Sequence, residues 1–293
     1  MASKLFFAGL LACMNGTVNA EAAGAVKAIL IKSGSSVASE QPTTLAGFGM
    51  LGQSTDSGYT PQTLTSVAWS ASSNLLLLSA ADLDFANSGN RPGESVIGML
   101  LCVNTGGAQS TWIPLAYDEF DAAKVLTGIT LPVALTSGRV LYGTAAPGLS
   151  RVYPAGLVPF LKGTRSLATA GVLRSAMLMS MTTALSEYPT TLSGFSMLDV
   201  CDDTGSGRVA LTSVAASNTG SPLSATKIAA ADLTFPNTGN ASRAVTKILV
   251  YIHVDGTDAN DIPLCCNDLD TDKTLTGTAA PIRGLTSYVL QVT

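Results

Sequence analysis

The sequence predicts an all-β protein made of two tandem, homologous β-sandwich or β-barrel modules, residues 1–146 and 147–293. Three observations support this fold class. The chain repeats itself nearly end to end, and its apolar stretches are short and separated by turn residues, as in sandwiches and barrels. A third observation is that no long amphipathic helical pattern is present.

The repeat is clearest at an offset of 147 residues, where the segment 40–51 (EQPTTLAGFGML) recurs as 187–198 (EYPTTLSGFSML). Farther along, 81–83 (ADL) recurs as 231–233 at an offset of 150, and changes of this size belong in loops. Each copy lies near the common domain size. We therefore expect a domain duplication in which each copy buries a core of its own.

Each copy carries five β-prone stretches, and Gly, Asn and Asp clusters such as 56–58 and 87–90 separate them. The stretch 247–253 is almost continuously β-prone, which predicts a central strand buried on both faces. The segment 142–148 is rich in Gly and Ala with one Pro and is the expected boundary between the copies. The expected strands are 26–31, 63–69, 75–78, 96–103 and 113–117, then 173–178, 210–215, 225–229, 245–254 and 262–266.

The first 22 residues imitate a secretory leader, and 10–13 (LLAC) even resembles a lipoprotein processing site. However, residues 4–14 align with 151–161 in the middle of the chain, where a cleaved leader would have no counterpart. Pro154 and Pro159 predict an extended edge strand or arm rather than a helix. Such arms can add to a neighbouring sheet, and the candidate partner-contact residues are Leu5, Phe6, Phe7, Leu10, Leu11, Val152, Tyr153 and Leu157.

Composition argues against several classes of function. Charged residues make up 12% of the chain, the net charge is −4 and no run of Lys or Arg occurs, so no nucleic-acid partner is expected. Apart from the leader-like N-terminus, no stretch approaches the run of apolar residues that a membrane span needs, so no membrane partner is expected. None of the cysteines occurs in both copies, which predicts free, buried thiols rather than a disulfide or zinc framework. They are Cys13, Cys102, Cys201, Cys265 and Cys266.

The sequence offers no catalytic, cofactor-binding or metal-binding constellation, and we expect no enzyme activity. The single histidine, His253, corresponds to Asn104 in the first copy, so a structural role is expected. The six aspartates within 255–272 suggest a calcium loop, but they fit no EF-hand spacing and are absent from the first copy. A solvated loop is the expectation there. The acidic residues shared by both copies, which we expect to cap turns, are Glu40, Glu187, Asp82 and Asp232.

Short motifs in both copies resemble the small β-rich virion proteins of tailed bacteriophages that are encoded near the major capsid gene. In the first copy they are 26–31 (VKAILI), 56–60 (DSGYT), 64–65 (LT) and 80–85 (AADLDF). In the second they are 231–235 (ADLTF), a hydrophobic strand ending in Tyr251, 255–258 (DGTD) and 262–264 (IPL). The chain departs from the family in its tandem arrangement and in Ser206, which replaces the Tyr59 of the first copy.

The resemblance implies a capsid decoration or cement protein. Such a protein is made in the host cytoplasm and sits on the outer surface of the virion. Its partners would be the major capsid protein and other copies of itself, either in a homo-oligomer or as neighbours on the shell. Two alternatives remain open at this stage: a component of the phage neck, tail or fibre, and a secreted or lipid-anchored bacterial surface adhesin.

Overall fold

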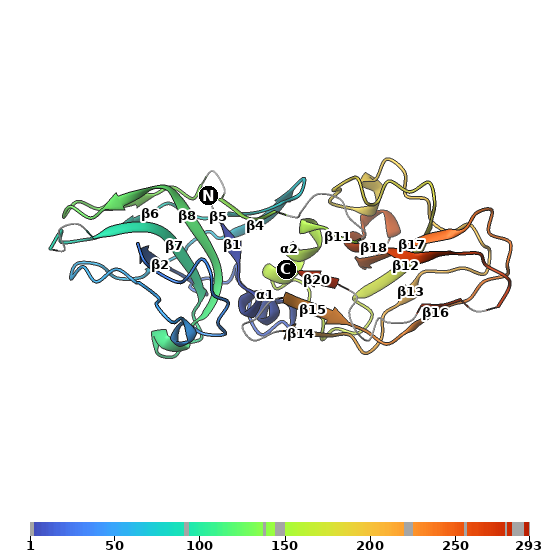
Figure 1. Cartoon of the computed structure of the whole chain (residues 1–293), viewed down its shortest axis with the longest axis horizontal. Coiled ribbons are helices and arrows are strands. Elements are labelled where there is room, and N and C mark those ends of the chain that lie inside the picture. Colours follow the sequence, from blue (N-terminus) through green and yellow to red (C-terminus); the bar gives the residue numbers. More distant parts are fainter. Residues whose placement is uncertain are drawn as a thin grey trace.

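The computed structural model describes residues 3–90, 94–136, 139–143, 150–219, 225–254, 257–278, 280–282 and 290–292. Regular structure in these ranges is mostly antiparallel strand, with two α-helices, so the predicted all-β class is confirmed. Figure 1 shows the strands of the two halves toward opposite ends of the long axis, with both helices between them. The predicted boundary after residue 146 and the predicted turn at 255–256 lie outside the described residues, and the duplication itself stays a prediction.

Within the described residues, the first half forms a five-stranded sheet, a three-stranded sheet and a two-stranded ribbon, all antiparallel. The five strands are, in spatial order, β1 (Lys4–Leu5), β8 (Ile113–Val125), β7 (Ser95–Val103), β2 (Val26–Lys32) and β3 (Gln62–Thr63). The three-stranded sheet has the order β10 (Arg139–Gly143), β5 (Leu75–Ser79) and β4 (Ala68–Ser72), and the ribbon pairs β6 (Leu83–Phe85) with β9 (Leu131–Val133).

The second half has the same arrangement, strand for strand. Its five-stranded sheet runs β11 (Ser150–Val152), β18 (Ile262–Lys273), β17 (Val245–Ile252), β12 (Leu173–Met179) and β13 (Val209–Ala210). The other strands are β14 (Ala215–Thr219), β15 (Ala225–Ala229) and β20 (Leu290–Val292) in one sheet, and β16 (Leu233–Phe235) with β19 (Ala280–Ile282) in a ribbon. Short 3-10 helices are η1 (Leu45–Gly47), η2 (Gln109–Thr111), η3 (Leu192–Gly194) and η4 (Asp258–Asn260).

Most of the predicted strands begin within one residue of the expected position, but the strands β6, β9 and β10, and their second-half counterparts β16, β19 and β20, were not predicted. The predicted central strand is confirmed, because β17 pairs with β12 on one side and with β18 on the other, and its side chains are buried on both faces of the sheet. Two predicted strands are wrong as single elements: 63–69 and 210–215 are each interrupted. Ser66 and Ser213 adopt positive φ angles of 54° and 53°, and this left-handed conformation ends the strand ladder.

The predicted extended arms are wrong for most of their length, because α1 (Phe7–Met14) and α2 (Pro154–Leu161) are helices. Pro154 occupies the first helical turn, where a missing N–H costs no intrahelical hydrogen bond. Pro159 removes one donor within the helix, a loss that burial of nearly every α2 side chain offsets. A helix that is apolar all round is stable only in a core.

The core has three parts. A first-half cluster and a second-half cluster each cover one face of a five-stranded sheet, and a shared cluster contains residues of both halves. Along β2 the side chains alternate as a strand requires: Ile29 and Ile31 belong to the first-half cluster, Ala28 and Leu30 to the shared one. The expectation that each copy buries a core of its own therefore fails for the shared cluster.

Candidate functional site

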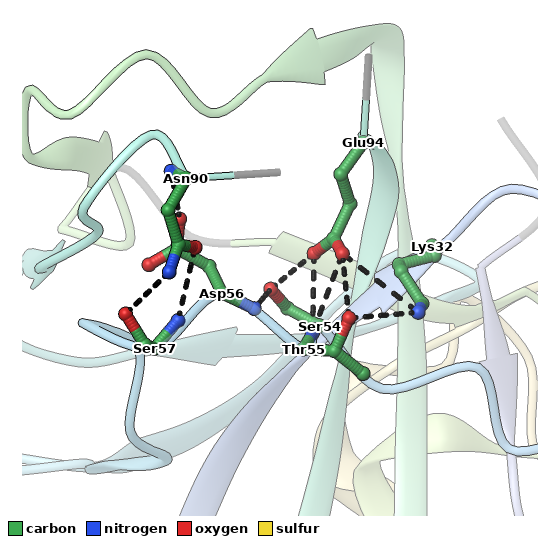
Figure 2. A network of polar contacts seen from close by, with 7 residues as sticks. All are labelled: Lys32, Ser54, Thr55, Asp56, Ser57, Asn90 and Glu94. Carbon is green, nitrogen blue, oxygen red and sulfur yellow. Dashed lines mark hydrogen bonds and ion pairs between the residues drawn. The ribbon is translucent and has the colours of Figure 1, made fainter. Parts of the chain in front are cut away.

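Asp56 ties together two loops of the first half (Figure 2). Its Oδ1 accepts hydrogen bonds from the backbone N–H of Gly58 at 2.8 Å and of Ser88 at 2.6 Å, and from the Ser88 hydroxyl at 2.9 Å. Its Oδ2 accepts the Asn90 N–H at 3.2 Å. Burial by itself would raise the pKa of Asp56, but these donors outweigh that effect and lower it.

Asp203 makes the same ties in the second half. Its carboxylate accepts the backbone N–H groups of Gly205 at 2.8 Å, Thr238 at 2.8 Å and Asn240 at 2.9 Å, and the Thr238 hydroxyl at 3.1 Å. Desolvation opposes ionisation here too, yet the donors lower the pKa of Asp203 to about 2. Both carboxylates are therefore ionised at neutral pH, and each accepts hydrogen bonds on both of its oxygens.

Two asparagines attach a third loop to each tie. The Asn87 side chain accepts the Gly128 N–H at 2.6 Å and donates to the Ile129 carbonyl. Asn237 accepts the Gly277 N–H at 2.8 Å and donates to the Thr278 carbonyl. In Figure 1 the loops that precede β7 and β17 lie toward the two ends of the molecule. Each end thus carries three loops that polar side chains hold in place.

The sequence predicts turns at 56–58, 87–90 and 237–240, but no turn was predicted at Asp203 and no contact between these loops was predicted. A signal was present, because Asp56 and Asp203 share the 147-residue offset and each half has an Asn-x-Gly-Asn motif about thirty residues later. The contact between each aspartate and this distant turn was not predicted. Loop ties of this kind explain the shared residues without any catalytic role.

A second carboxylate, Glu94, binds the neighbouring residues Ser54 and Thr55 at the same end of the first half (Figure 2). It accepts hydrogen bonds from the Ser54 hydroxyl and, at 3.0 Å, from the Thr55 hydroxyl, and it lies 3.7 Å from the Lys32 ammonium. Desolvation would raise the pKa of Glu94, but the donors lower it. In the second half a different ion pair, between Arg243 and Asp199 at 2.8 Å, occurs near the matching tie.

The acidic region of the second half forms a salt-bridge cluster rather than a solvated loop. Asp261 is fully buried, accepts the Val254 N–H at 2.8 Å and lies 3.0 Å from His253 Nδ1. Arg208 reaches Asp258 at 3.3 Å and Asp261 at 3.8 Å. Farther along, Asp268 lies on β18 and pairs with Lys247 at 3.4 Å. The solvated-loop prediction is therefore wrong for Asp261 and Asp268, whereas Asp258 is exposed.

The same cluster contains side chains of the types that bind metal ions. Ligand atoms of His253, Asp258 and Asp261 lie within 4.8 Å of one another. The Arg208 guanidinium already supplies the positive charge that these carboxylates require, and a cation would have to displace it. The geometry therefore fits a structural ion-pair cluster, in line with the structural role predicted for His253.

The shared glutamates cap loops, as predicted. Glu40 Oε2 accepts the Gly49 N–H at 2.8 Å, and Glu187 Oε2 accepts the Ser196 N–H at 2.7 Å. Asp82 Oδ1 likewise accepts the N–H groups of the two residues after Ala134, at 2.7 and 3.0 Å. The backbone N–H of Ser196, together with its hydroxyl, holds the pKa of Glu187 below its usual range.

The predicted partner-contact residues are buried inside this chain, so the structure does not present them as arms. Phe6 packs edge-on against Phe48 at 5.7 Å between ring centroids, and Tyr153 packs in the same way against Phe195 at 5.7 Å. Leu5, Phe6, Phe7, Leu10, Tyr153 and Leu157 are buried, and Leu11 and Val152 are partly buried. They build the core around α1 and α2.

Two methionines differ from the other exposed large apolar residues of the described ranges, Val125, Ile129 and Met181, because they correspond to each other in the two halves. Met50 is 59% exposed and Met197 is 44% exposed, and they occupy matching positions in the two halves. A pair of hydrogen bonds clamps each backbone: Met50 exchanges bonds of 3.0 and 2.9 Å with Ser36, and Met197 exchanges bonds of 3.2 and 2.9 Å with Thr183. Each half thus presents a flexible apolar side chain from a fixed loop, which suits contact with another protein.

The five cysteines all lie in the described residues, are buried and form no disulfide, as predicted. Burial raises the pKa of Cys13 to about 12 and that of Cys266 to about 12, with weaker contributions from nearby charged groups at Cys266. Thiols held in the protonated form are poor nucleophiles and poor metal ligands. They act as small apolar residues of the core.

Comparisons with protein families, curated proteins and solved structures find no match. The geometry of this chain and its sequence motifs are therefore the basis for the function proposed below. Within the part of the chain that the structure describes, no helix is long and apolar enough to cross a membrane.

Proposed function

We propose that this protein is a virion structural protein that decorates the outer surface of a bacteriophage head and stabilises the shell by bridging capsid subunits. The observation that carries the proposal is the matched pair of exposed methionine loops, Met50 and Met197, on two halves that share one core. A body with two equivalent contact surfaces can engage two equivalent subunits. The motif resemblance to head-associated phage proteins supplies the identity of the surface.

Bridging stabilises a shell by mass action. A protein that binds only the assembled shell lowers the free energy of that state relative to the dissociated one. Once one half is bound, the second half acts at a high effective concentration, provided the spacing fits. The shared core fixes that spacing and avoids the ordering cost that a flexible linker would add.

The polar groups of the two tips support contact rather than catalysis. The carboxylates of Asp56 and Asp203 are hydrogen-bonded to neighbouring loops, and the carboxylate of Asp261 is paired with His253 and Arg208. A general acid or base needs a proton-accepting position free for substrate. We accordingly propose no catalytic role, cofactor or metal, with the major capsid protein as the partner and neither nucleic acid nor membrane.

The deciding experiment is a cryo-electron microscopy reconstruction of purified particles that contain the full chain. Density for this chain on the outer face of the head, between capsid subunits, is the expected result. Density at the neck, the tail or a fibre would replace the proposal with its nearest alternative. A chain absent from particles, whose mature form has lost the segment before residue 23, would favour the surface adhesin.

Variants test the contact surface on the same particles. Met50→Ser with Met197→Ser removes both matched apolar side chains and should reduce occupancy on the head. Met181→Ser is the matched control, because Met181 is 53% exposed but its counterpart in the first half is Gly34. Equal occupancy for the two variants would exclude the methionine loops as the contact.

A further inference from the structure

The contact between the two halves is reciprocal. The Ala20 N–H donates to the Leu161 carbonyl at 2.9 Å, and the Leu167 N–H donates to the Met14 carbonyl at 2.9 Å. The 147-residue offset converts Ala20 into Leu167 and Met14 into Leu161, so each bond is the counterpart of the other. Reciprocity of this kind defines the interface of a two-fold symmetric dimer.

Close approaches at two glycines obey the same relation. A Cβ added to Gly16 would lie 2.7 Å from Ser166 Oγ, and a Cβ added to Gly163 would lie 2.7 Å from Asn19 Cβ. Gly163 is the counterpart of Gly16, and Ser166 is the counterpart of Asn19. Both glycines therefore leave room for the opposite half at equivalent points.

The helices complete the exchange. α1 packs on β8 of its own half and also contacts β14 and β15, whereas α2 packs on β18 and also contacts β4 and β5. The Thr226 hydroxyl donates to the Phe7 carbonyl at 3.2 Å, and Lys162 lies 3.6 Å from Glu21. Each half thus lends a helix to the core of the other, and all of these contacts are non-covalent.

We propose that this interface also joins halves of different copies, so that two chains associate by exchanging halves. The covalent connection between the halves runs only through residues 144–149, which separate β10 from β11. Two chains that exchange halves form two such interfaces, as two separate chains do. The interface energy is therefore the same in both states. The equilibrium between single chains and exchanged dimers is set by the concentration of the chain compared with the effective concentration of one half at the other within a single chain.

The test uses the full chain with a specific protease site inserted within residues 144–149. Isotopically heavy and normal protein are cleaved separately, then unfolded together, refolded and weighed by native mass spectrometry. We expect one-to-one complexes of first and second halves, about half of them pairing a heavy with a normal half as random pairing requires. Halves that refold as separate monomers would overturn the proposal.

The uncleaved chain supplies a second measurement that does not depend on refolding of fragments. After refolding at increasing protein concentration, light scattering should show a rising fraction of particles with twice the mass of one chain. A single-chain mass throughout the concentration series would contradict the exchange between copies. The mass of purified chain that was never unfolded gives the baseline.

Two glycine pairs give a matched control for the interface. Gly16 and Gly163 have φ angles of 72° and 65°, and Gly24 and Gly171 have nearly the same angles of 75° and 73°. A Cβ at Gly24 or Gly171 meets nothing within 4 Å. Alanine at the first pair should weaken association of the cleaved halves by about tenfold more than alanine at the second pair. Equal effects of the two double variants would show that the opposite half does not press on Gly16 and Gly163.

Discussion

Leu10→Ala is the substitution that most directly tests the central position of α1. The Leu10 side chain is fully buried in the shared cluster, whereas Leu11, the next residue of the same helix, is only partly buried. Truncation to alanine removes three carbon atoms, with a transfer cost of about 2.4 kcal/mol at about 0.8 kcal/mol per methylene. The residual cavity adds to this, so we expect a loss of about 3–4 kcal/mol.

The assay is equilibrium unfolding in urea, monitored by circular dichroism and by tryptophan fluorescence, with Leu11→Ala as the matched control. Leu11→Ala should cost about 1 kcal/mol, because much less surface is removed from the core. If Leu10→Ala costs no more than Leu11→Ala, α1 is not part of the core and the segment behaves as the free arm that its sequence suggested.

The counterpart Leu157→Ala extends the test to the other half. Leu157 is also fully buried in the shared cluster. Because both leucines stabilise one core, each substitution should shift a single cooperative transition rather than one of two. Two separated transitions, each sensitive to one substitution, would refute the shared core.

Three further predictions follow from the polar groups and the thiols. The pKa of Asp203 is lowered in the folded chain to about 2, so its stabilising contribution is complete above about pH 4 and is lost as the pH falls towards 2. Asp203→Asn should therefore make the melting temperature less dependent on pH in melts recorded from about pH 2 to 6. Arg208→Met leaves the buried Asp261 carboxylate without its guanidinium partner and should lower the free energy of unfolding in urea by about 2 kcal/mol or more. Asp258→Asn changes an exposed partner of Arg208 and should lower it by less than about 1 kcal/mol. The buried cysteines should resist alkylation by iodoacetamide in the folded chain and react after denaturation, and rapid labelling of the folded chain would contradict their burial.

The strands and their turns could be predicted from the sequence because the signals are local. β2, β5, β7 and β15 follow from β-branched and apolar runs bounded by turn residues, and the loop-capping roles of Glu40 and Glu187 follow from a carboxylate beside a turn. The repeat predicted which features both halves would share. The buried free thiols followed from the absence of any cysteine common to the two copies.

Only the tertiary structure decided how α1, α2 and the loop ties are arranged. An eight-residue helix that contains Pro159 has no stability of its own, and burial against both halves makes it helical. Asp56 finds its donors at Ser88 and Asn90, more than thirty residues away, and no local pattern encodes that meeting. The shared core has the same origin, because the sequence marks which residues are apolar but long-range topology determines which half covers them.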